Sequence, residues 1–178
     1  MRRAQIHQRP LSDAQDELLQ AALHWHRASN GVYDVNDPNL SELQEHIQIS
    51  ADVADSWPPP YLLVGRKSTT AQLFGSEFAK HVAGQPGVPD RTFENLVNAR
   101  YQHVSESGEA AFDTVTCTII PPNCAPMGLV YDRLILPSRF NDGARTFSVF
   151  TVIQKKFAVV SSSSGDLLLH SKPANLRH

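Results

Sequence analysis

Cysteine is scarce in this sequence of 178 residues, which contains only Cys117 and Cys124. Two cysteines are too few for a secreted domain held together by disulfides, and they lack the paired spacing of a zinc site. The chain has no run of about 18 apolar residues, and no apolar segment follows the arginines near its start, so we expect neither a membrane span nor a signal peptide. These absences predict a cytoplasmic protein.

The sequence also lacks an excess of charge of either sign. It has 16 Lys and Arg residues against 18 Asp and Glu residues, and no basic block follows the first three residues. A protein that tracks a phosphate backbone needs clustered positive charge. We therefore expect no binding to nucleic acid.

Motifs of catalysis are missing as well. The sequence contains no Gly-x-Ser-x-Gly nucleophile elbow and no glycine-rich phosphate loop. Cys117 lies within an alternating apolar run, where it is most simply a small buried side chain. His24 and His26 are two positions apart, so on a helix they point to different sides and make poor joint metal ligands. The sequence therefore predicts a protein that is not an enzyme.

What the sequence does have is enough apolar side chains for one core. Hydrophobic residues make up 41% of a chain of ordinary single-domain length. We expect an N-terminal helix and connector at residues 1–42 and a central domain at residues 43–157. Residues 158–178 contain a serine run and are expected to form a flexible tail.

The first helix is predicted from residue 12 to about residue 29. Ser12 and Gln15 form a capping-box pair at its start. Its apolar stripe, which ends in Trp25, needs a surface to cover.

A longer helix is predicted from Asp90 to about Glu106. Asp90 suits the N-cap position, and Gly108 follows the helix as a stop. Its apolar face follows three-four spacing and consists of Phe93, Leu96, Val97, Tyr101 and Val104. Two shorter helices are expected before it, at residues 68–74 and 77–82, each ended by a glycine.

Strand character marks five segments. The first two lie around Ile47 to Val53 and at Tyr61–Arg66, separated by a proline-rich connector. The last three are Ala111–Ile120, Leu129–Leu136 and Thr146–Gln154, which short turns join into antiparallel hairpins. Strands and helices in this arrangement predict an α+β fold.

The hairpin register predicts one ion pair. If Cys117 lies opposite Leu129, then Asp113 lies opposite Arg133, on the same side of the sheet as Tyr131. The sequence leaves two roles open for this arginine. It either fixes the strand register with Asp113, or it meets an anionic or polar ligand together with Tyr131.

Several short motifs carry a family resemblance. They are Tyr61-Leu62-Leu63-Val64-Gly65, then Leu73-Phe74-Gly75 with Gly84 nine residues later, and Tyr131-Asp132-Arg133-Leu134-Ile135-Leu136-Pro137. In this order they resemble a PAS-like domain family common in alphaproteobacteria, over about residues 43–154. The chain departs from the family pattern at the opening of the first strand and in the proline triplet after it.

The resemblance implies a five-stranded antiparallel sheet with helices packed on one face, and a sensory or regulatory role in signal transduction. It also implies a site between sheet and helices for flavin, haem or a small metabolite. Asn123-Cys124 lies in a turn and lacks the rest of the flavin-binding photosensory motif, and His81 or His103 alone does not indicate haem. The cofactor therefore stays unknown, and the candidate ligand-binding residues are Tyr131, Arg133, Cys117, Phe93, Val97 and Tyr101.

Both faces of the strand at residues 129–136 are largely apolar, so the second face needs a cover. The helix at residues 12–29 either folds back onto its own sheet or packs against a second subunit, and we predict a homodimer. Two function classes follow. One is a sensory module that binds a small ligand or a partner protein, and the other is a ligand-free interaction or dimerisation scaffold.

Overall fold

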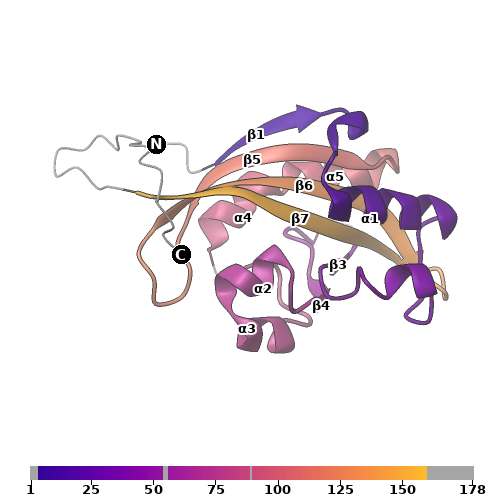
Figure 1. Ribbon diagram of the computed structural model, residues 1–178. Coiled ribbons are helices and arrows are strands. Elements are labelled where there is room, and N and C mark those ends of the chain that lie inside the picture. The colour runs from indigo at the N-terminus through magenta and orange to yellow at the C-terminus, as the bar shows by residue number, and fades with distance from the viewer. Residues whose placement is uncertain (1–3, 54–55, 89, 160–178) are drawn as a thin grey trace, which may run out of the picture.

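The structure is a computed structural model that describes residues 4–53, 56–88 and 90–159 (Figure 1). It has an α+β fold built on one sheet, in which the strands follow the order β1-β5-β6-β7-β3-β4. All of these neighbours pair antiparallel, and a short strand, β2, pairs parallel with β6. The predicted α+β class and antiparallel sheet are therefore confirmed.

The described residues form seven strands, five α-helices and two short 3-10 turns. The strands are β1 (Ala4–Arg9), β2 (Val32–Tyr33), β3 (Gln48–Ala51), β4 (Tyr61–Val64), β5 (Ala111–Ile119), β6 (Met127–Phe140) and β7 (Arg145–Ala158). The helices are α1 (Glu17–Ala28), α2 (Thr69–Phe74), α3 (Ser76–His81), α4 (Arg91–Val97) and α5 (Ala99–Ser107). Short 3-10 turns lie at Leu11–Asp13 and Pro38–Leu40.

The sheet has more strands than the five that were expected. The five expected strands correspond to β3 to β7, and the N-terminal segment adds β1 and β2. β1 is an edge strand with the sequence Ala-Gln-Ile-His-Gln-Arg, which lacks strict apolar alternation. Its position comes from backbone pairing with β5 along its whole length, which the side-chain pattern does not encode.

The central hairpin follows the predicted register. Cys117 pairs with Leu129 and Asp113 with Arg133 across β5 and β6. β6 extends beyond its predicted end, through Pro137 to Phe140, because β7 and β2 pair with this part of the strand. The three consecutive antiparallel strands are therefore confirmed.

The start of the first helix was predicted wrongly. The N-cap is Asp16, whose carboxylate accepts a hydrogen bond from the Leu18 N–H at 2.9 Å. Ser12 lies in the preceding 3-10 turn instead, so Ser12 and Gln15 do not form a capping box. An aspartate is as good an N-cap as serine and adds a negative charge at the positive end of the helix dipole, so it competes well.

Helix α1 folds back onto the sheet of its own chain. Trp25 is fully buried and contacts Phe150 of β7 edge to face, with ring centroids 6.4 Å apart. The same core cluster contains Leu134 and Leu136 of β6. Figure 1 shows α1 on the opposite side of the sheet from α2 and α3. The sequence left two possibilities for this helix, packing on its own sheet or on a second subunit, and in the structure it packs on its own sheet.

The other face is covered by α2, α4 and α5. The predicted helix from Asp90 to Glu106 is wrong as a single element, because it is divided at Asn98. The Val97 carbonyl accepts a hydrogen bond from Arg133 Nη1 at 3.3 Å, and the Tyr101 N–H instead bonds the Asn98 carbonyl. A side chain from the sheet therefore replaces one rung of the helical ladder, which is a known cause of helix breaks.

Two further expectations were a flexible C-terminal tail and the absence of a membrane span. Residues 160–178, which make up most of the expected tail, lie outside the described residues. Within the part of the chain that the structure describes, no helix has both the length and the apolar composition needed to cross a lipid bilayer.

Candidate ligand pocket

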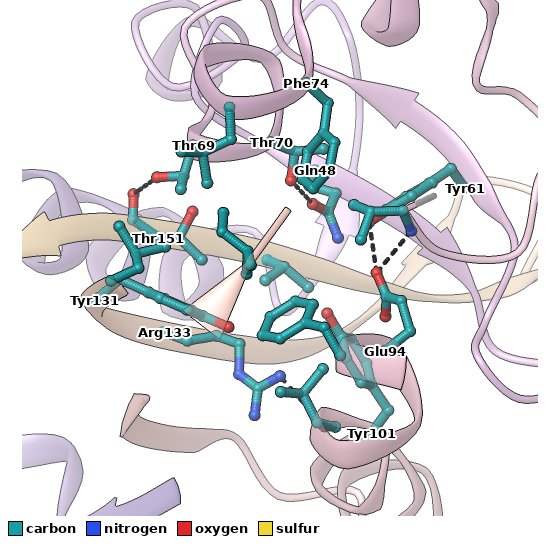
Figure 2. Close-up of a pocket in the computed structure, with 17 residues that line it drawn as sticks. Gln48, Tyr61, Thr69, Thr70, Phe74, Glu94, Tyr101, Tyr131, Arg133 and Thr151 are labelled. Carbon is teal, nitrogen blue, oxygen red and sulfur yellow. Dashed lines mark hydrogen bonds between the residues drawn. The ribbon is translucent and has the colours of Figure 1, made fainter. Parts of the chain in front are cut away.

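A pocket opens between the sheet and the helices α2 and α4, with about 500 Å³ of empty space including its mouth (Figure 2). Its walls come from β3, β4, β5, β6 and β7 on the sheet side and from α2, α4 and α5 on the helical side. Its wall is concave and largely apolar with a few polar groups, as at many small-molecule sites.

Five of the six predicted ligand-binding residues line this pocket: Phe93, Val97, Tyr101, Tyr131 and Arg133. Strand β6 supplies two of them, and helices α4 and α5 supply the others. The sixth, Cys117, is buried in the neighbouring apolar core but is not part of the pocket wall. The sequence therefore identified the helix face and the strand that meet at the pocket.

The predicted ion pair between Asp113 and Arg133 forms and is buried. Arg133 donates through Nε to Asp113 Oδ1 at 3.0 Å and through Nη2 to Oδ2 at 2.9 Å. Both side chains are almost fully buried, and the guanidinium carbon lies 5.5 Å from the centroid of the Tyr101 ring. Such a two-point contact is the strongest geometry for an arginine and a carboxylate.

These contacts occupy the arginine. Its third hydrogen bond goes to the Val97 carbonyl, so each of its three nitrogens has a protein partner. Burial by itself would lower the pKa of the Arg133 guanidinium, but the carboxylate of Asp113 raises it above its ordinary value. Of the two roles left open for Arg133, this geometry favours the structural one.

Sequence analysis missed six polar residues of the wall: Gln48, Tyr61, Thr69, Thr70, Glu94 and Thr151. Glu94 is only 6% exposed, and its Oε1 accepts hydrogen bonds from the Val88 N–H at 2.7 Å and the Tyr61 hydroxyl at 3.5 Å. Helical spacing contained a signal for it, because Glu94 lies three positions before Val97 and seven before Tyr101 and therefore shares their face.

Helix α2 is attached to the sheet by two threonines. Thr69 donates to the Thr151 carbonyl of β7 at 3.1 Å, and Thr70 donates to Gln48 Oε1 at 2.7 Å. The second bond occupies the amide oxygen of Gln48 and leaves its nitrogen directed toward the pocket, as Figure 2 shows.

The tyrosines of the pocket keep their protons at neutral pH. Burial raises the pKa of Tyr131 and of Tyr61 well above the ordinary value, and it raises the pKa of Tyr101 to about 12. The Tyr131 hydroxyl has no hydrogen-bond partner among the described residues, although the side chain is only 6% exposed. The hydroxyl oxygen is accessible from the pocket, where a ligand or water can bond it.

The two cysteines differ in reactivity, which gives a direct test of the core. Cys117 is buried, and this burial raises the pKa of its thiol to about 12, whereas Cys124 is exposed. The thiolate is the reactive form, so at pH 8 a thiol reagent such as DTNB is expected to modify one cysteine in the native protein and two in denaturant. The variant Cys124→Ser should show no fast-reacting thiol. Rapid modification of that variant would contradict the burial of Cys117.

The pocket chemistry suits binding through hydrogen bonds and apolar contact. Across residues 4–53, 56–88 and 90–159, no group of three or more His, Cys, Asp or Glu side chains is arranged to hold a metal ion. The polar groups of the wall are hydroxyls, an amide, one carboxyl group and the Arg133 guanidinium, set among phenyl and aliphatic side chains.

A scan against models of known protein families and a search of curated proteins found no match to this chain.

Proposed function

We propose that this chain is a PAS-like sensory or regulatory module that binds a small ligand in the pocket between its sheet and helices and signals its occupancy to a partner. The observation that carries the proposal is the Tyr131 hydroxyl, which faces the pocket and has no partner among the described residues. A side chain in this state is expected where an exogenous group completes the hydrogen bonding.

The order of elements supports the proposal. Two strands, β3 and β4, are followed by four helices and then by three hairpin-linked strands, which is the order implied by the family resemblance. The pocket lies between the helices and the sheet, where that resemblance expects a ligand. Binding there would change the contacts of α2 and α4 with the sheet, and these contacts are a route by which occupancy alters the outer surface.

A ligand-free interaction scaffold is the second candidate, and the edge strand β4 is the observation that favours it. Leu62 and Leu63 on this strand are more than one third exposed, and β4 ends the sheet order, with backbone hydrogen bonds on its outer side at Tyr61 to Gly84 and Gln85. Exposed edges with apolar side chains pair readily with other chains. The predicted homodimer belongs to this proposal, and size-exclusion chromatography with light scattering tests it.

Native mass spectrometry of the purified protein, together with its absorption spectrum, tests the sensor. We expect a bound small-molecule mass on the wild type that disappears in Thr151→Phe, because the added ring enters the pocket from β7. Thr118→Phe is the matched control, since Thr118 is half-buried and alternates with Ile119 to the opposite face of the sheet.

The outcomes separate the two candidates. A bound mass that persists in Thr151→Phe would mean that the ligand binds outside this pocket, and it would contradict the proposed site. A clean apo mass, combined with no thermal stabilisation by any member of a small-molecule library, would favour the scaffold instead.

A further inference from the structure

We propose that the pocket ligand is a small uncharged ring compound that presents carbonyl-type acceptors to the Tyr131 hydroxyl and the Gln48 amide. This inference rests on the proposed ligand-binding function and specifies its chemical class. Three features of the wall support this class: its unused donors, its charges and its apolar side chains.

Two donors in the wall have no acceptor among the described residues. One is the Tyr131 hydroxyl, and the other is the Gln48 Nε2 amide group, whose partner oxygen is already bonded by Thr70. Tyr131 is 6% exposed and Gln48 is 8% exposed, and the polar atoms of both are accessible from the pocket. Figure 2 shows the two side chains reaching the pocket from different strands. Unused donors require acceptors, and carbonyl oxygens supply them.

The charges of the wall argue against an anionic ligand. Arg133 is the positive group of the wall, and its three nitrogens already bond Asp113 and the Val97 carbonyl. Arg100 lies 3.5 Å from the same carboxylate, outside the pocket wall. A carboxylate ligand would therefore find each guanidinium nitrogen of Arg133 already bonded within the protein, and buried charges need such partners.

A cationic ligand is disfavoured by the same two donors. An ammonium group can donate to the Tyr131 oxygen and to the Glu94 carboxyl, but it offers no acceptor to the Tyr131 O–H or the Gln48 amide N–H groups, so these two donors would have no ligand partner. The remaining wall is aromatic and aliphatic, with Phe74 and Phe93 on the helices and Leu129 on the sheet. A flat apolar body with acceptors at its rim meets all of these groups.

Four probes of similar size test the class: acetophenone, ethylbenzene, 1-phenylethylamine and benzoate, with dissociation constants measured by ligand-observed NMR. We expect acetophenone to bind at least about fivefold more tightly than each of the others, as one net hydrogen bond provides. Tyr131→Phe should remove most of this preference and leave the affinity for ethylbenzene unchanged. Because the hydroxyl has no protein partner, this variant should fold like the wild type.

The control variant is Tyr33→Phe, which removes a tyrosine hydroxyl on the α1 side of the sheet, where Tyr33 packs against Phe140. It should keep the full preference for acetophenone. Gln48→Met is a second pocket variant and should weaken acetophenone but not ethylbenzene.

Other results of the probe measurements would contradict the acceptor class, the uncharged class or the whole inference. Equal affinity for acetophenone and ethylbenzene would overturn the acceptor class while leaving a ligand-binding pocket. Tighter binding of benzoate or of the amine would overturn the uncharged class. No binding of any probe would overturn the inference, and the native mass spectrum would then decide separately whether the pocket binds a ligand at all.

Discussion

Asp113→Ala is expected to lower the free energy of unfolding by about 3–5 kcal/mol, because it breaks a buried ion pair. Asp113 is fully buried and Arg133 is 2% exposed, so the variant leaves a guanidinium in the interior without its counter-charge. Water cannot reach the group to replace the lost bonds. Urea unfolding at pH 7, followed by far-UV circular dichroism, measures the change.

A double variant separates the cost of leaving one buried charge unpaired from the net contribution of the ion pair to stability. Asp113→Leu combined with Arg133→Met replaces the bidentate pair by apolar groups of similar volume and should recover part of the stability, because Arg100, whose Nε lies 3.5 Å from Asp113 Oδ2, still loses its partner. Glu77→Gln removes an exposed partner of Lys80 and should have no measurable effect. A loss in Asp113→Ala no larger than that of Glu77→Gln would contradict a buried pair.

Trp25→Ala is expected to cost a similar amount, about 3–5 kcal/mol, because it leaves a large cavity between α1 and the sheet. Trp25 is fully buried against Phe150, and both belong to the cluster that closes the second face of the sheet. The same urea titration measures it.

Leu96→Ala is the matched control for this variant. Leu96 is a large apolar side chain on a helix of the other face, and it is 41% exposed, so its loss should change stability by no more than about 0.5 kcal/mol. Equal effects of the two substitutions would mean that α1 does not cover the sheet in solution.

The strand pairing could be predicted from the sequence because side-chain alternation leaves few registers. A shift by one residue would have turned Val115 and Cys117 away from the core and separated Asp113 from Arg133, so the observed pairing is the one that satisfies all four side chains. In β1 this alternation is limited to Ala4 and Ile6, which pack against the core, while backbone pairing with β5 runs along the whole strand.

The pocket could be predicted only in part, because side-chain spacing groups residues within one element and not between elements. The apolar face of residues 90–106 identified Phe93, Val97 and Tyr101, because helical spacing groups them. Glu94 lies on the same face, but a carboxyl group is ordinarily assigned to solvent, and only the surrounding structure keeps it buried. Gln48 comes from β3, which the sequence does not relate to α4, so its part in the pocket required the assembled fold.

The hydrogen bond from Arg133 to the Val97 carbonyl has a consequence for how this chain tolerates change over generations. The same side chain sets the register of β5 against β6 through Asp113 and ends α4 at Val97, so two separate local structures depend on one position. Loss of the arginine alone would harm both at once, whereas a joint change at positions 113 and 133 removes the charge conflict. Among descendants of this sequence, these two positions are therefore expected to be replaced together, with residues near the α4–α5 junction changing in the same lineages.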